Sequence, residues 1–249
     1  MEETLQLILL SIIGIFAGFL NVTAGGESLL TLPFLIFLGL PASVANGTNR
    51  IAILVQNIFA TAKFHQFEVI PKGVTIITAL PAIVGSVLGA QLAVEIDELL
   101  FKRLLAIIMI LILGLIFFNP KVEELNSTPK ISGGKKFILV IAFFGIGFFG
   151  GFIQGGIGFL FIAVLTACGY DLVRTNALKV LIILIFTPFV LLVFILNNQV
   201  DFFRGSILAA GNAVGALLAT HVVVERGHKF IRWVVLIAAV GFAIKLFFG

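Results

Sequence analysis

Ten apolar segments, separated by polar stretches or by glycine and proline, take up nearly all of this 249-residue chain. They are 5–20, 29–40, 44–64, 74–94 and 99–118, followed by 137–153, 159–169, 175–196, 207–224 and 230–248. A helix that crosses the hydrocarbon of a bilayer needs about 20 apolar residues, and the third to fifth segments of each set reach or approach this length. With 60% hydrophobic and 11% charged residues, the chain is too apolar for a soluble domain of this size. The sequence therefore predicts an all-α polytopic membrane protein.

The first two segments of each set are short, and glycine-rich sequence joins them at 21–28 and 154–158. The one long polar stretch, 119–134, contains two prolines, two lysines and two glutamates. We therefore divide the chain into a first transmembrane repeat (1–118), a linker (119–134) and a second transmembrane repeat (135–249). Each repeat is expected to hold a glycine-broken helical hairpin followed by three transmembrane helices.

Polar, charged and glycine residues recur in the same order in the two sets. The matched pairs are Gly14 with Gly147, Gly18 with Gly151, Asn21 with Gln154, Gly25 with Gly158, Asn46 with Asn176, Gly85 with Gly215 and Glu95 with Glu225. Apolar segments align with one another easily by chance, but an ordered series of such matches does not. The series therefore predicts an internal repeat.

The distribution of basic residues predicts how the two repeats face. If each short pair forms a hairpin or two short spans, the second repeat is inverted, and eleven basic residues lie on one side of the membrane against five on the other. If each short pair is a single span, the repeats are parallel and the basic residues divide eight and eight. Basic loops concentrate on the cytoplasmic side. This bias favours inverted repeats, with the linker in the cytoplasm, both chain termini outside, and the plasma (inner) membrane as the location.

The two glycine-rich breaks are the first candidate binding elements. Helices interrupted within a membrane expose backbone groups and dipoles that can hold an ion, and glycine allows close approach to a ligand. The alternative is close helix packing through small residues. Polar side chains in the breaks favour binding, because packing alone does not call for them. The candidate substrate-binding residues here are Asn21, Thr23, Gly25, Gly26, Ser28, Gln154, Gly155, Gly156 and Gly158.

The second candidate element is the start of the third segment in each repeat, which contributes Asn46, Thr48, Arg50, Asn176 and Lys179. Its two cations occupy nearly corresponding positions, so an inversion axis would bring them to opposite approaches of one central cavity. A cation inside a membrane segment is costly and marks a functional site by default. The alternative is that both side chains snorkel to the headgroups from a helix end. Two cations together with helix N-termini indicate a small anion as the ligand.

Glu27 is the acid inside the first break and is the coupling candidate. It could pair with Arg50, carry a coupling proton or sodium ion, or be a solvated turn residue. The sequence has no P-loop, no HExxH or GxSxG motif, and a single cysteine, Cys168. We therefore expect no enzymatic activity, no cofactor and no metal site. The basic residues lie singly or in pairs between apolar runs, which indicates topology determinants rather than a nucleic-acid surface.

These motifs together resemble the sulfite exporter TauE/SafE family of membrane anion transporters. The resemblance rests on the glycine-rich break early in each half, the apolar run around Pro33, and Asn46-Gly-Thr48 with Thr175-Asn176-Ala at the start of a long segment. It covers nearly the whole chain and implies transport of sulfite, sulfonates or other small organic anions. The second half departs from the pattern, because the position that corresponds to Pro33 is occupied by Thr166 and not by a proline.

The resulting hypothesis is a gradient-coupled secondary transporter that moves small anions by alternating access. A passive anion channel is the first alternative, and saturable flux with counterflow would separate the two. A membrane assembly subunit without transport of its own is the second, although the short loops leave little surface for docking. An intramembrane enzyme would need a nucleophile or metal constellation that the sequence does not contain.

Overall fold

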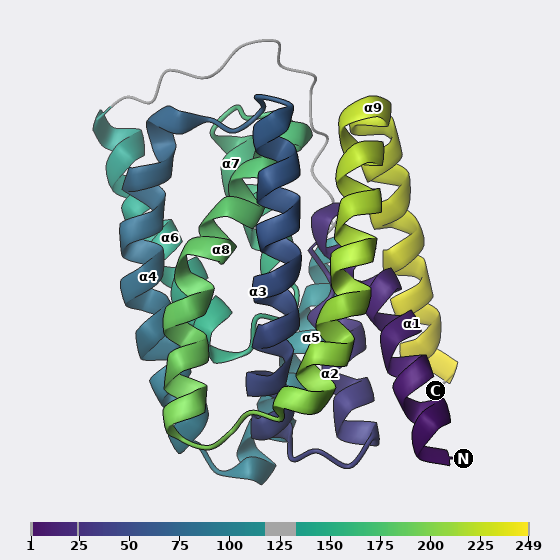
Figure 1. The fold of residues 1–249 in the computed structure, drawn as a ribbon. Coiled ribbons are helices and arrows are strands. Elements are labelled where there is room, and N and C mark those ends of the chain that lie inside the picture. The colour runs from purple at the N-terminus through teal and green to yellow at the C-terminus, as the bar shows by residue number, and fades with distance from the viewer. Residues whose placement is uncertain (1, 24, 118–132, 249) are drawn as a thin grey trace.

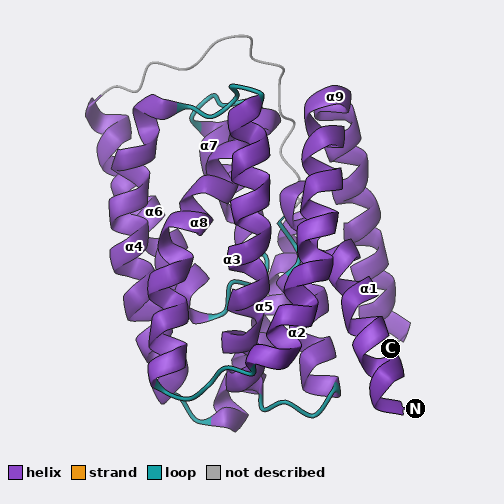
Figure 2. Cartoon of the chain, in the orientation of Figure 1, coloured by secondary structure: helices purple, strands orange, loops and turns teal. Residues whose placement is uncertain are grey.

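The computed structural model describes residues 2–23, 25–117 and 133–248, and all regular structure in these ranges is helical (Figures 1 and 2). The helices are α1 (Glu2–Thr23), α2 (Ser28–Phe37), α3 (Ala42–Gln66), α4 (Lys72–Glu95), α5 (Glu98–Phe117), α6 (Gly133–Phe152), α7 (Ile157–Ala167), α8 (Leu172–Leu196) and α9 (Phe202–Phe248). The expectation of an all-α protein is therefore confirmed.

The distribution of side chains is that of a protein in a membrane. Large apolar side chains cover the outside: Phe37 is 81% exposed, and Ile76 and Leu196 are each 72% exposed. Several charged and amide side chains, among them Arg50, Lys179 and Gln56, are instead fully buried. Within the part of the chain that the structure describes, five helices are long and apolar enough to cross a bilayer: α1, α4, α6, α8 and the first part of α9. In water this surface would be strongly unfavourable, whereas lipid solvates it.

Two helical hairpins are the elements that position the polar interior. Figure 1 shows α1 and α2 entering from the end of the molecule where the chain starts, and α6 and α7 entering from the opposite end. The first helices are longer than the sequence predicted: α1 has 22 residues and α6 has 20, so the expectation that segments 5–20 and 137–153 are short was wrong. The α-helical conformation continues through the polar residues at their ends. Only the returning helices are short, with 10 residues in α2 and 11 in α7.

Two further boundaries differ from those expected. Segments 207–224 and 230–248 are joined in one continuous helical run, α9, which turns back in Figure 1 so that it ends near the start of α1. The short polar stretch between the two segments contains one glycine, Gly227, and no proline. This single glycine does not end the helical run. The expected linker, 119–134, lies outside the described residues except for Gly133 and Gly134, which begin α6.

Glycine contacts hold the outer helices against each other. α1 packs on α9 and α6 packs on α4, so the first helix of each half lies against a late helix of the other half. At Gly18 a Cβ atom would overlap with the Asn212 backbone, and at Gly151 it would overlap with the Ser86 carbonyl. Small residues allow such close approach of helix backbones in membranes. The central helices α3 and α8 contact each other inside this frame.

Gly151→Ala tests this packing, with Gly145→Ala on the same helix as its matched control. The added methyl group at residue 151 would collide with the backbone of α4, whereas nothing lies within 4 Å of the position it would take at residue 145. We expect Gly151→Ala to lower the free energy of unfolding by about 1–3 kcal/mol. Gly145→Ala should keep or slightly raise it, because alanine favours the helix. Thermal unfolding of the purified protein in detergent measures both, and equal stability of the two variants would contradict the packing described.

Candidate functional site

The two helix breaks meet at a pair of glycines in the interior. Gly25 adopts a left-handed conformation with φ of 83°, which glycine tolerates without strain. Its neighbour across the contact is Gly158, and a Cβ atom on either residue would overlap with the Cα atom of the other. In the second break, Gln154 and Gly156 have φ values of 60° and 75°. The two breaks were predicted separately, and the structure brings them into direct backbone contact.

Arg50 of α3 binds the end of α6. Its Nη1 donates to the Gly150 carbonyl (2.6 Å) and to the side-chain oxygen of Gln154, and its Nη2 donates to the Gly151 carbonyl (3.0 Å). Asn46, one turn earlier on α3, accepts from Nη2 (3.0 Å) and donates to the Phe152 carbonyl (2.7 Å). We call Arg50, Asn46, Gln154 and these three carbonyl groups the arginine cluster.

Lys179 of α8 binds the end of α1 in the corresponding way. Its Nζ donates to the carbonyl groups of Asn21 (2.5 Å) and Val22 (3.2 Å) and to Oδ1 of Asn176 (2.8 Å). The Asn176 amide in turn donates to the Thr23 carbonyl (3.3 Å). We call Lys179, Asn176 and these three carbonyl groups the lysine cluster.

Both cations therefore lie at the negative ends of broken helices. The last carbonyl groups of a helix have no partner within the helix, and the helix dipole places negative potential there. Arg50 and Lys179 are each fully buried, so the interpretation that they snorkel to headgroups is wrong. The sequence placed them near the breaks but gave no sign that helix C-termini would be their partners. A polar Asn three or four residues before each cation was the available signal.

Glu27 does not form an ion pair with Arg50 among the described contacts. Its carboxylate accepts hydrogen bonds from the side-chain amides of Gln56 on α3 and Asn212 on α9, the latter at 2.6 Å. The Asn212 amide also donates to Oε1 of Gln56 at 3.2 Å. Glu27 is 2% exposed, so it is not a solvated turn residue. We call Glu27, Gln56 and Asn212 the carboxylate cluster.

Sequence reasoning missed Gln56 and Asn212. Both are fully buried amides inside otherwise apolar stretches, and an isolated amide within a membrane segment was the signal that could have found them.

The other predicted residues lie around these clusters or apart from them. The Ser28 hydroxyl accepts from the Asn49 amide at 3.0 Å, which ties the start of α2 to α3. Thr48 is buried, but its hydroxyl accepts from the Asp201 backbone N–H (2.9 Å) in the loop before α9, so it joins none of the clusters. Gly26 and Gly155 have room for a methyl group at ordinary contact distances. These two glycines are therefore not required by close packing.

Several buried polar atoms of these elements have no hydrogen-bond partner among the described residues. The donors include Asn21 Nδ2, Arg50 Nε and the hydroxyl groups of Thr61 and Thr175, and the acceptors include Asn49 Oδ1 and Asn212 Oδ1. Buried polar groups in proteins are nearly always paired, so a group of unpaired donors beside two buried cations calls for an explanation. N–H and O–H donors beside positive charge are the groups that bind an oxyanion.

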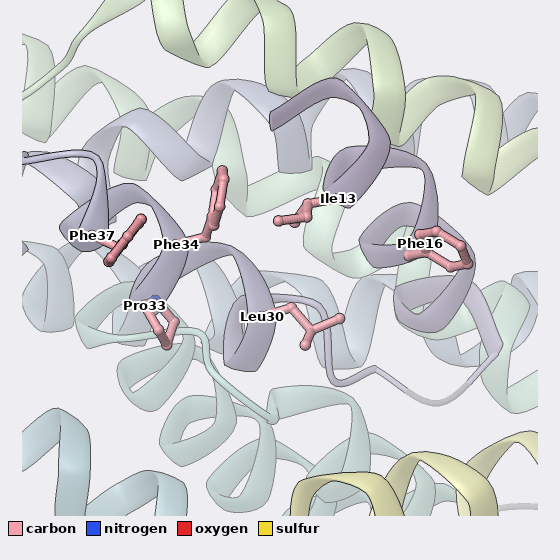
Figure 3. Close-up of a pocket in the computed structure, with 6 residues that line it drawn as sticks. All are labelled: Ile13, Phe16, Leu30, Pro33, Phe34 and Phe37. Carbon is pink, nitrogen blue, oxygen red and sulfur yellow. The ribbon is translucent and has the colours of Figure 1, made fainter. Parts of the chain in front are cut away.

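The cavity between α1 and α2 has the opposite chemistry. It measures about 520 Å³ and is lined by apolar side chains, which Figure 3 shows as sticks: Ile13, Phe16, Leu30, Pro33, Phe34 and Phe37. Phe16 is 63% exposed, so the cavity opens to the lipid-facing surface. It offers no polar side chain to an anion, and the polar clusters remain the candidate site.

Comparison with known proteins decides the family. The sequence model of the sulfite exporter TauE/SafE family matches residues 10–246. The chain belongs to the TauE/SafE family. Members are membrane transporters, so this protein is a membrane transporter and not an enzyme. No solved structure matches the chain.

Curated relatives of this TauE/SafE protein carry matching descriptions. It is 30% identical over 250 residues to the "Probable membrane transporter protein YfcA" of Escherichia coli strain K12, covering 100% of this chain and 92% of the relative. A "Probable membrane transporter protein" of Haemophilus influenzae is 29% identical over 233 residues, covering 93% of this chain and 90% of the relative. A "Probable membrane transporter protein ORF9" of a Sinorhizobium species is 24% identical over 231 residues, covering 92% and 88%. The match therefore extends over the full set of helices.

Lys179→Met tests the cap at the end of α1. Methionine keeps the apolar stem but donates no hydrogen bond, so the Asn21 and Val22 carbonyl groups lose their partner. We expect the free energy of unfolding to fall by about 1–3 kcal/mol, the cost of a buried unsatisfied polar group. Lys136→Met on the exposed start of α6 is the control and should change it by less than about 0.5 kcal/mol. Chemical unfolding in detergent compares them, and equal values for both variants would argue against the capping role.

Proposed function

We propose that this protein is a secondary transporter that moves small sulfur-containing or organic anions across the plasma membrane by alternating access. The observation that carries the proposal is the set of unpaired donors beside Arg50 and Lys179. Asn21 Nδ2 belongs to the residue whose carbonyl binds Lys179, Thr175 lies one turn before Lys179, and Arg50 Nε belongs to the other cation. An oxyanion would satisfy these donors.

The chemical class of the substrate follows from charge and from the family. The interior clusters hold two cations and one carboxylate, so their net charge is positive while Glu27 is ionised. A positive, desolvated interior favours an anion over a cation or a neutral solute. The matching family is described as sulfite exporters, which supports sulfite, sulfonates and related organic anions as candidates.

The arrangement of helices supports inverted repeats. The hairpin α1–α2 and the hairpin α6–α7 enter from opposite ends (Figure 1). Each first helix packs on a late helix of the other half, α1 on α9 and α6 on α4. The contact between Gly25 and Gly158 joins two positions that match in the sequence repeat. Transporters built in this way bind their substrate where the repeats meet, and one repeat rocks against the other.

In this proposal the substrate contacts come from both hairpins and both central helices. The first break and α3 contribute Asn21, Thr23, Gly25, Gly26, Ser28, Asn46 and Arg50, whereas Thr48 is left out because its hydroxyl accepts from the Asp201 backbone N–H. The second break and α8 contribute Gln154, Gly155, Gly156, Gly158, Asn176 and Lys179. Glu27 is the coupling residue, for a proton or a sodium ion.

Arg50→Gln tests the anion site, because it removes the charge and most donors of the arginine cluster. Absolute stability will also fall, so the decisive measurement is the further stabilisation produced by added anions. Specific binding raises stability by about 2.7 kcal/mol when the ligand is at 100 times its Kd. We expect a panel of sulfite, sulfate, sulfonates and carboxylates to include an anion that stabilises the wild type and not Arg50→Gln.

Arg103→Gln on the exposed surface of α5 is the control and should keep the full anion response. Saturable uptake with counterflow in vesicles, for the same anion, would distinguish a carrier from a channel. If no anion in the panel stabilised the wild type, the anion-transport proposal would be overturned.

A second experiment tests the orientation, which we propose has the linker in the cytoplasm and both chain termini outside. On a Cys168→Ser background, single cysteines replace Lys136 at the start of α6 or Asp97 before α5. The start of α6 and the loop between α4 and α5 lie at opposite ends of the molecule (Figure 1). A thiol reagent that does not cross membranes should label Asp97→Cys in intact cells and Lys136→Cys only after the cells are opened. The reverse pattern would invert the topology.

A further inference from the structure

The carboxylate cluster is a buried ionisable group that the anion contacts do not use. Glu27 lies at the start of α2, and its partners Gln56 and Asn212 come from α3 and α9. Thus one carboxylate connects the first hairpin, a central helix and the helix on which α1 packs. All three side chains are buried. Burying an ionisable residue inside a membrane protein costs free energy, so such a residue is a candidate functional site.

The second half of the chain shows that the fold does not require this cluster. The offsets that match Gly25 with Gly158 and Asn46 with Asn176 place Leu160, Phe186 and Ala82 at the positions corresponding to Glu27, Gln56 and Asn212. These three apolar residues belong to or pack against the main hydrophobic core. The same helix junction is therefore built from apolar side chains in one half and from polar ones in the other. Stability alone does not explain the polar version.

The surroundings of Glu27 favour a proton over a sodium ion. Sodium is a hard cation that is held by several oxygen ligands, whereas both amide partners present N–H donors to the carboxylate. The charged groups that act on Glu27 are Arg50 on α3 and Lys179 on α8, both positive, and α9 faces it with the neutral Asn212. A sodium ion would be repelled by the positive charges of these two side chains. A proton needs only one carboxylate oxygen. Asn212 Oδ1 is a buried acceptor with no partner among the described residues, and the neutral acid could donate to it after the amide group rotates.

Proton binding at Glu27 would change the charge that an anion meets. With Glu27 ionised, the two cations and one carboxylate sum to a single positive charge, and with Glu27 protonated they sum to two. The cluster is also linked to the arginine cluster through short connections. Ser28, next to Glu27, accepts from Asn49, and Asn49 precedes Arg50 on α3. A group that repels the anion is therefore neutralised when the proton binds.

We propose that the Glu27–Gln56–Asn212 cluster is a proton-binding site, one per chain, whose occupation strengthens anion binding and so couples anion transport to proton movement. This rests on the proposed anion transport and specifies its coupling ion. Linkage makes the effect reciprocal: the proton raises anion affinity by the same factor as the anion raises proton affinity. We expect one proton per chain, because the position in the second half that corresponds to Glu27 is the apolar Leu160.

The test measures anion affinity as a function of pH with probes that do not titrate themselves. Sulfate and methanesulfonate keep their charge between about pH 5 and about pH 9, so any pH dependence must come from the protein. We expect the affinity of whichever anion binds to rise about fivefold or more as the pH falls across this range. Glu27→Gln, which mimics the protonated acid in shape and charge, should bind with the low-pH affinity at every pH. Glu95→Gln at the exposed end of α4 is the matched control and should keep the wild-type pH dependence.

A second measurement on the wild type keeps the proposal falsifiable if Glu27→Gln does not fold. Addition of saturating anion to weakly buffered protein should cause uptake of up to one proton per chain. Infrared difference spectra should show the carbonyl band of a protonated carboxylic acid appearing at the same time. Anion binding that is independent of pH and takes up no proton would overturn the proton site while leaving anion transport in place. Failure of every anion to bind at any pH would overturn the proposed function and this inference with it.

Discussion

The carbonyl groups at the ends of α1 and α6 impose the main constraint on this structure. Each helix ends in the buried interior of the protein, and an unsatisfied backbone group there costs several kcal/mol. Lys179 and Arg50 supply the missing donors from the two central helices. The breaks, the cations and the asparagines next to them therefore form one set of interactions, which satisfies the last carbonyl groups of α1 and α6. Removing any of these residues leaves the others without partners.

This arrangement also shows how one residue could stabilise the fold and contribute to the proposed anion site. A guanidinium carries five N–H donors, and Arg50 uses its Nη atoms on backbone carbonyls and side-chain amides, while Nε has no partner among the residues that the structure describes. The carbonyl contacts fix the position of the cation. Its charge, which the helix dipole only partly offsets, remains available to an anion.

The sequence predicted the parts of the fold that follow from hydrophobicity and helix propensity. The helical membrane character, the two breaks and the cations at 50 and 179 were all visible in it. Contacts between residues far apart in the sequence could not be predicted from it. Nothing local to Glu27 indicates Asn212, which lies 185 residues away, and nothing local to Lys179 indicates the end of α1. The predicted helix ends were also wrong. Asn21, Val22 and Thr23 were predicted to belong to a polar break, but they continue α1. Their carbonyl groups, which have no partner within the helix, accept hydrogen bonds from another helix.

The contact between Gly25 and Gly158 limits how far the two halves of this chain can diverge. At other positions the two halves already differ, with Glu27 against Leu160 and Pro33 against Thr166. At the crossing, however, the partner of each residue is backbone, which no exchange of a neighbouring side chain can move aside. A larger residue at one position cannot be balanced by a smaller one at the other, since glycine already stands at both. Over evolutionary time, these two sites should therefore change last and together, while the polar residues around them adapt to different substrates.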